Sequence, residues 1–125
     1  MRKQYHFRRS GKDVFIWDCD RLVALSEALP SEIVPLSSIR ELDEAYWRQD
    51  GEAHLTCREL VGHLRLILEA DLGYPIILSA DGRIMDGMHR VMKAVLEDRG
   101  EIRAVRFVQD PDPDYVNVPV SDLPY

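Results

Sequence analysis

Cysteine is scarce in this chain, which also has no long apolar run and no secretory leader. The two cysteines, Cys19 and Cys57, are 38 positions apart. We expect ordinary thiols here rather than a lone disulfide or a catalytic thiol. No apolar stretch approaches the roughly 20 residues of a membrane span, and residues 1–6 lack the apolar core of a signal peptide. These absences predict a cytoplasmic protein without membrane contact.

The net charge of −6 is unevenly distributed along the chain. Residues 1–12 carry five basic side chains and no acidic one, whereas residues 13–82 carry five basic and fourteen acidic groups. Nonspecific binding to nucleic acid depends on clustered cations. We therefore expect no direct DNA binding. The basic segment is expected to be an exposed end, with contact to an anionic partner left as an alternative.

A chain of 125 residues with 46% apolar content can build one core without a metal or a disulfide. We expect a basic N-terminal arm at 1–12, a single domain at 13–108 and an extended Asp/Pro-rich tail at 109–125. Strands are predicted at 13–17 and 33–36. A helix is predicted over 21–29, with Asp20 as its N-cap and Pro30 as its end.

The second half of the chain has the clearer patterns. Thr56 and Glu59 have the capping-box spacing, and the helix that follows is expected to end before Gly73. We expect its apolar stripe, Cys57 included, to be buried. Strands at 75–78 and 83–85 flank Ala80-Asp81-Gly82, a hairpin signal. A helix then runs from 88 to Gly100, and a strand from 102 to 108. Residues 40–54 are expected to be a loop with one helical turn.

The strand-to-helix turn from Asp86 to Arg90 has the features of an anion site. The first turn of a helix exposes backbone N–H groups without intrahelical partners, and the helix dipole favours negative charge there. Gly87 leaves the backbone open to a ligand, and the Arg90 guanidinium suits phosphate oxygens. His89 can donate a hydrogen bond or carry a proton. Structural roles explain the same residues equally well: Asp86 as N-cap, Gly87 as a tight turn, and His89 and Arg90 as surface groups.

The order of Pro75–Leu78, a hairpin, Ile84–Arg90, an apolar helix and Arg103–Phe107 resembles the ParB/sulfiredoxin-like fold. Val34–Ile39 is similar to the opening strand of that family. The resemblance covers residues 33–108, about 60% of the chain. It implies an α/β (α+β) domain with a small mixed sheet and flanking helices. In this family a Gly-x-His-Arg turn binds nucleotide phosphates, and free-serine kinases of the fold carry Asp-Gly-His-His-Arg, which this chain matches except at Met88.

The resemblance implies a site for a nucleoside di- or triphosphate with Mg²⁺, able to support phosphoryl transfer or nucleotide hydrolysis. The amides of Gly87, Met88 and His89 and the side chain of Arg90 would hold phosphates. His89 would polarise or protonate the bound substrate. Asp86 would cap the helix or hold metal and substrate. By analogy with the serine kinases, Glu44 is the candidate general base, although a solvated acidic turn at 41–44 explains it as well. Lys93 can reach a phosphate or form a surface pair with Glu97.

Departures from the family narrow these expectations. Sulfiredoxins carry a reactive cysteine where this chain has Met88, so we do not expect sulfiredoxin activity. Chromosome-partitioning members carry DNA-binding and dimerisation domains after this one. We do not expect the Asp/Pro-rich tail to form either domain. His54 and His63 lack partners at metal-ligand spacing, and no protein-held metal site is expected. The alternative to nucleotide binding is a non-catalytic regulatory module that binds another protein. Nuclease activity is often ascribed to this family. It would require a cluster of metal-binding carboxylates, which this sequence does not contain.

Overall fold

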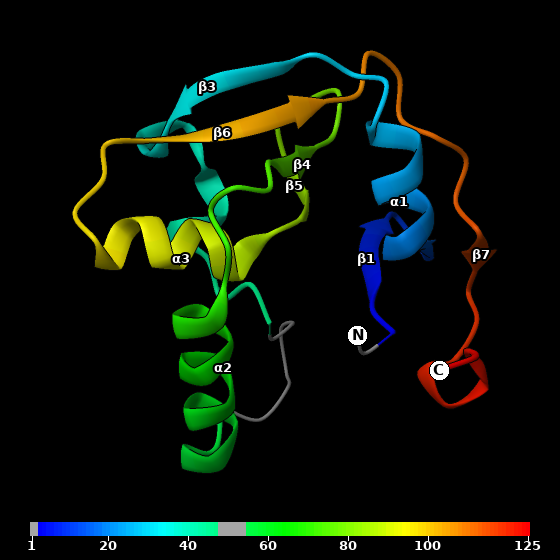
Figure 1. Cartoon of the computed structure of the whole chain (residues 1–125). Helices are drawn as coiled ribbons and strands as arrows, with labels where there is room; N and C mark the ends of the chain where they lie inside the picture. The colour runs from blue at the N-terminus through cyan, green and yellow to red at the C-terminus, as the bar shows by residue number, and fades with distance from the viewer. Residues whose placement is uncertain (1–2, 48–54) are drawn as a thin grey trace.

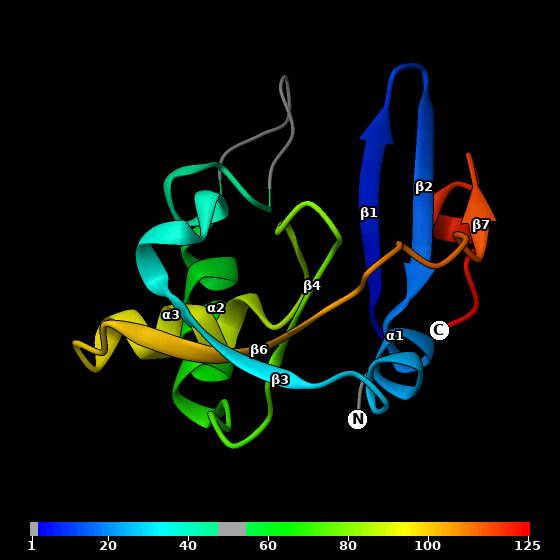
Figure 2. The ribbon, with the colours of Figure 1, turned by 90° about the horizontal axis from the view of Figure 1, so that it is seen from above.

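The computed structural model describes residues 3–47 and 55–125, arranged around two β-sheets. Figures 1 and 2 show the smaller sheet, with α1, lying beside the body formed by the larger sheet, α2 and α3. The α+β class with a small mixed sheet and flanking helices is therefore confirmed. No helix in the described part of the chain is long and apolar enough to cross a membrane.

The smaller sheet joins the two ends of the chain. Its strands β1 (Tyr5–Ser10) and β2 (Asp13–Asp18) pair antiparallel around Gly11, and β7 (Tyr115–Val116) adds to the other side of β2. Residues 5–10, expected within an exposed arm, thus form a paired strand, and the tail contributes another. The expectation of an exposed arm is wrong for the first four of these residues, which are half-buried, whereas Arg9 and Ser10 are exposed as expected.

The larger sheet has the order β3-β6-β4-β5 and mixed pairing. Strands β3 (Ser31–Pro35) and β6 (Glu101–Arg106) are antiparallel, whereas β6 and β4 (Ile76–Leu78) are parallel. The predicted hairpin is confirmed: β4 and β5 (Ile84–Asp86) pair antiparallel. Pro35 ends a strand at the edge of the sheet, where its missing N–H costs no ladder bond.

Three α-helices and three short 3₁₀ helices complete the fold. Helix α1 spans Cys19–Ser26, α2 spans Cys57–Glu69 and α3 spans Met88–Leu96. The capping box at Thr56 and Glu59 is confirmed. The 3₁₀ turns are η1 (Leu36–Ser38), η2 (Arg40–Asp43) and η3 (Val120–Asp122). Of the expected loop at 40–54, η2 is the predicted helical turn, and residues 48–54, His54 included, lie outside the described residues.

The start of α1 differs from the sequence prediction. Asp18 is the N-cap, and its carboxylate accepts a hydrogen bond from the Asp20 amide at 2.9 Å. Asp20, the predicted cap, lies in the first turn because β2 runs directly into the helix. Of the apolar residues of this helix, Leu22 is fully buried, whereas Val23 and Leu25 are exposed.

The core consists of two clusters, one on each face of the larger sheet. One cluster joins β3, β4, β5, β6 and α3, and includes Ile76, Met88 and Val91. The other joins the sheet to α1 and β2 through Trp17, Leu22 and Phe107. Sheet residues that alternate in sequence supply both clusters, as the two-residue period of a strand requires. This shared sheet fixes the end of β5 and the start of α3, where the candidate site lies.

Helix α2 contradicts the prediction that its apolar stripe is buried. Ile67 is its only buried residue, and Cys57, expected in the core, is exposed. Figure 1 shows α2 extending away from α3 and the larger sheet. The helical period was predicted correctly, but most of the apolar face packs on nothing in the described part of the chain.

The two carboxylates at the start of α1 provide a test of the corrected cap. Asp18→Ala removes the side chain that satisfies a first-turn amide, so we expect a loss of about 1 kcal/mol in the free energy of unfolding. Asp20→Ala is the matched control, because Asp20 also contacts Lys3 but caps no amide. Urea denaturation measures both variants. A larger loss for Asp20→Ala than for Asp18→Ala would contradict the assignment.

Candidate functional site

The turn between β5 and α3 leaves the first amides of the helix without a side-chain cap. Strand β5 ends at Asp86, Gly87 is the N-cap residue, and α3 begins at Met88. Gly87 has φ of 109° and has no side chain with which to cap the helix. Asp86 precedes the cap position, so its expected role as N-cap is wrong. The positive end of the helix dipole therefore remains open at this turn.

Gly87 is required by close packing as well as by its backbone angle. A Cβ at this position would lie 2.8 Å from Nη2 of Arg90 and 2.8 Å from Cγ2 of Ile76. The Arg90 guanidinium thus folds back over the turn. The alternative expectation of a surface group extending into solvent is wrong for Arg90. Any larger residue would displace either the guanidinium or strand β4.

Arg90 is held in this position by Asp86. Its Nη2 donates to Asp86 Oδ2 at 3.0 Å, one helical turn away, and both side chains are largely buried. Its Nε is buried and has no hydrogen-bond partner among the described residues. Burial raises the pKa of Asp86, and the charge of Arg90 opposes that rise. The pair places a partly satisfied cation beside the open helix end.

His89 forms part of a stack of three rings. Its Nε2 lies 2.9 Å from Nδ1 of His63 on α2, so one nitrogen donates and the other accepts. Trp47 stacks on both rings, with centroids 3.8 Å from His63 and 5.1 Å from His89. The sequence predicted His89 on a polar helix face, and the structure shows that this face meets α2. His63, for which the sequence indicated no role, is brought to the site.

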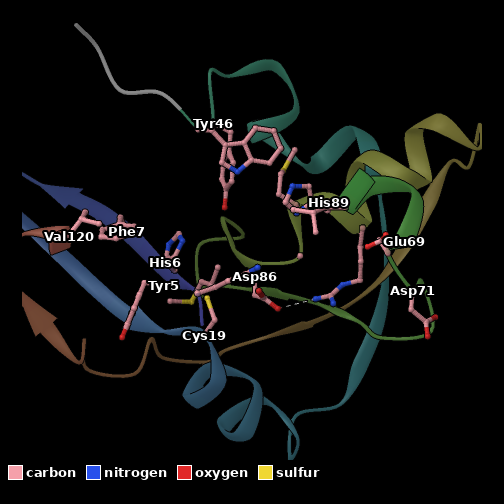
Figure 3. A pocket seen from close by; sticks show the side chains of 18 residues that line it. Tyr5, His6, Phe7, Cys19, Tyr46, Glu69, Asp71, Asp86, His89 and Val120 are labelled. Atoms are coloured by element: carbon pink, nitrogen blue, oxygen red, sulfur yellow. Dashed lines mark hydrogen bonds and ion pairs between the residues drawn. The ribbon is translucent and has the colours of Figure 1, made fainter. Parts of the chain in front are cut away.

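A cleft of about 760 Å³ opens in front of this turn, between the two sheets. Figure 3 shows His6, Cys19, Tyr46 and Asp86 around its interior. Its walls are the start of β1, the β5–α3 turn, the Tyr46-Trp47 pair and the end of α2. The residues of the turn that line it are Asp86, Gly87, Met88, His89 and Arg90.

Burial keeps three of the side chains that line the cleft uncharged. It lowers the pKa of His6 to about 4, with a further contribution from Arg8, and raises the pKa of Cys19 to about 12. The pKa of Tyr46 is raised as well, mainly by burial. At neutral pH these side chains are therefore an imidazole, a thiol and a phenol. Cys19 is not an activated nucleophile, in agreement with the expectation of an ordinary thiol.

Three predicted site residues have other contacts. Both carboxylate oxygens of Glu44 accept from Arg83, at 2.7 and 2.9 Å, and Glu44 does not line the cleft. Lys93 donates to the carbonyls of Leu68 and Ala70, at 3.1 and 2.6 Å, and so joins α3 to the end of α2. The side chain of Met88 is buried in the core, which leaves only its amide to face a ligand. Among the described residues, no group of three potential metal ligands is found.

Little in the sequence indicated the second wall of the cleft. Tyr5, His6 and Phe7 come from a segment expected to be an exposed basic arm, and its alternation of aromatic and basic residues was a signal of a strand. Glu41 was grouped with Glu44 as part of an acidic turn, yet it is buried and accepts from the Ile84 amide at 2.6 Å. Its role is to fix η2 to β5.

Substitution of Gly87 tests the packing at the turn. In Gly87→Ala the positive φ and the two 2.8 Å contacts oppose the new methyl group. We expect a loss of about 1–3 kcal/mol in the free energy of unfolding. Gly62→Ala is the matched control, because Gly62 lies in α2 with nothing near its Cβ position. That change should stabilise the helix by about 0.5–1 kcal/mol. Equal effects in urea denaturation would refute the packing argument.

The raised pKa of Asp86 predicts a pH-dependent contribution to stability. The folded state holds this proton more tightly than the unfolded chain does, so the contribution is present at low pH and is lost as pH rises through the folded pKa. The wild type should therefore lose stability relative to Asp86→Asn as pH rises above the ordinary carboxyl pKa.

Asp81 gives the opposite control, because a hydrogen bond from Ser79 lowers its pKa. The wild type should lose stability relative to Asp81→Asn as pH falls below the ordinary carboxyl pKa. Urea denaturation across the pH range measures both differences, and a shared sign would contradict these assignments.

Comparison with known proteins adds no family to this description. No protein-family model matches the chain, and no curated protein or solved structure matches it. The resemblance to the ParB/sulfiredoxin-like fold therefore stays a prediction, and any function must be argued from the cleft itself.

Proposed function

We propose that the cleft binds a nucleoside di- or triphosphate, with its phosphates at the start of α3. The observation that carries this proposal is the uncapped helix end at Gly87, with the Arg90 guanidinium packed beside it. Helix N-termini bind phosphate through free amides and the helix dipole, and a guanidinium adds a planar fork. A cleft of about 760 Å³ is within the usual size of small-molecule sites.

The aromatic residues of the cleft suit the rest of a nucleotide. Tyr46, Trp47 and His89 form one side, and Tyr5, His6 and Phe7 lie on the opposite strand. Flat rings offer stacking surfaces to a base without requiring hydrogen-bond readout. This arrangement supports a nucleotide over a bare phosphate ion, and it does not choose between bases.

Mg²⁺ fits this site as a companion of the nucleotide rather than as a protein-held ion. Asp86, one residue before Gly87, is the carboxylate beside the proposed phosphate position. Mg²⁺ is commonly held by one or two carboxylates together with substrate phosphates. When bound, it would neutralise phosphate charge, and Asp86 would orient the complex.

Binding without catalysis is the second candidate, and the position of Glu44 favours it. The candidate general base is paired with Arg83 outside the cleft, and the carboxylates that do line the cleft are Glu69, Asp71 and Asp86. In that case the nucleotide would control a regulatory module that binds another protein. Phosphoryl transfer would require a base other than Glu44.

Isothermal titration with Mg²⁺-bound ATP, ADP and CTP tests nucleotide binding. We expect saturable binding by the wild type and a loss of roughly tenfold or more in affinity for Arg90→Ala. Arg83→Ala is the matched control, because Arg83 is also ion-paired with a carboxylate but lies outside the cleft. It should bind as the wild type does.

Folding must be separated from binding in this comparison, since Arg90→Ala leaves Asp86 buried without its partner. Arg90→Lys keeps the charge and loses the fork, so it should fold and still bind more weakly. Far-UV circular dichroism checks each variant. No heat of binding by the wild type at millimolar nucleotide, or equal binding by folded Arg90 and Arg83 variants, would sink the proposal.

A further inference from the structure

A second cavity, of about 320 Å³, lies between residues 41–47 and helix α3. Much of its lining is apolar and includes Leu42, Leu55, Met88 and Met92. Among the described residues that line it, the charged ones are Glu41 and Glu44, and both are acidic. Small-molecule sites combine apolar walls with a few polar groups in this way. The lining therefore suits a ligand with an apolar body and a positive charge.

Glu41 brings to this cavity a carboxylate that is satisfied at one oxygen only. The residue is 4% exposed, and its Oε2 accepts from the amide of Ile84 at 2.6 Å. Its Oε1 is buried and has no hydrogen-bond partner among the described residues. Buried polar atoms are nearly always hydrogen-bonded, because an unpaired one carries its full desolvation cost. A ligand that donates a hydrogen bond to Oε1 would offset that cost.

Arg83 does not supply this donor. Its Nη1 donates to both carboxylate oxygens of Glu44, at 2.7 and 2.9 Å, and Arg83 does not line the cavity. The hydrogen bond with Glu44 raises the pKa of Arg83, and the charge of Glu41 adds a smaller contribution. The guanidinium thus influences Glu41 through its charge, while its hydrogen bonds go to Glu44. Oε1 of Glu41 is left for a donor from outside the chain.

We propose that this cavity binds a small primary alkylammonium, with its N–H groups on Oε1 of Glu41 and its alkyl chain against Met88 and Met92. An ammonium supplies both the donor and the charge that suit a buried carboxylate. A water molecule would supply a donor too, but it needs further polar partners, which leucine and methionine side chains do not offer. An alkyl chain matches these walls, and methionine adapts readily to apolar ligands. This inference does not depend on nucleotide binding in the cleft.

Isothermal titration of the full chain with n-pentylammonium tests the proposal. We expect saturable binding with a dissociation constant in the millimolar range, as suits a ligand of few atoms. 1-Pentanol lacks the charge, and pentyltrimethylammonium keeps the charge but has no N–H to donate. Each should therefore bind roughly tenfold more weakly or worse. Absence of saturable binding by n-pentylammonium, or equally tight binding of either analogue, would overturn the proposal.

A lysine side chain carries the same head group, so its binding must be compared. Nα-acetyl-lysine methylamide represents a lysine within a peptide, and its backbone amides do not suit an apolar wall. We expect it to bind more weakly than n-pentylammonium. Tighter binding would assign the cavity to a lysine of a partner protein and overturn the assignment to a small amine.

Glu41→Gln tests the anchor of the ligand. The substitution keeps an oxygen for the amide of Ile84 and removes the charge, so the affinity for n-pentylammonium should fall by roughly tenfold or more. Asp43→Asn is the matched control, because Asp43 lies on the same 3₁₀ helix but is exposed and does not line the cavity. It should bind as the wild type does. Equal affinities of folded Glu41→Gln and the wild type would contradict the proposed contact.

Methionine methyl signals in NMR spectra locate the amine on the wild-type chain, so the test holds even if Glu41→Gln does not fold. Met92 lines the cavity but not the cleft, Met85 lines the cleft but not the cavity, and Met88 lines both. Saturation with n-pentylammonium should therefore shift the methyl signal of Met92 and leave that of Met85 in place. A shift of Met85 without one of Met92 would place the amine in the cleft and overturn the proposal.

Discussion

The close packing of Arg90 on Gly87 fixes the geometry on which the candidate site depends. The same glycine lies against Ile76 of β4, so the hairpin, the start of α3 and the guanidinium share one contact. Without a side chain at this position, β5 turns into α3 in a single residue and the first helical amides face the cleft. Asp86 completes the arrangement by holding Arg90 from the preceding strand.

This arrangement costs some stability, since it buries a carboxylate and leaves Arg90 Nε without a partner among the described residues. Ion pairs that are largely removed from water recover little of their desolvation cost, and a carboxyl with a raised pKa in a cleft is typical of functional sites. The proposed ligand supplies what the site lacks, because phosphate oxygens can accept from the guanidinium and from the helix amides. Burial of His6, Cys19 and Tyr46 keeps these cleft side chains uncharged, which suits an aromatic ring.

Features encoded in a few neighbouring residues could be predicted from the sequence. The capping box at Thr56, the hairpin of β4 and β5 and the turn at Gly87 are of this kind, because local hydrogen bonds and backbone angles decide them. Contacts between distant segments could not be predicted: β7 pairs with β2 about 100 residues away in the sequence and completes the smaller sheet. Periodicity identified the apolar face of α2 but could not show that the body would leave it open. Glu44 and Lys93 were placed near the site by analogy and spacing, and Arg83 and the end of α2 hold them elsewhere.

The most direct test of the central claim is an NMR titration of the backbone amides with ADP and Mg²⁺. If the start of α3 holds the phosphates, the amide signals of Gly87, Met88 and His89 should shift in a saturable manner, together with the side-chain signal of Arg90. Inorganic pyrophosphate should shift the same amides, and a nucleoside without phosphate should not. Shifts confined to other parts of the chain, or none at millimolar ligand, would contradict the account.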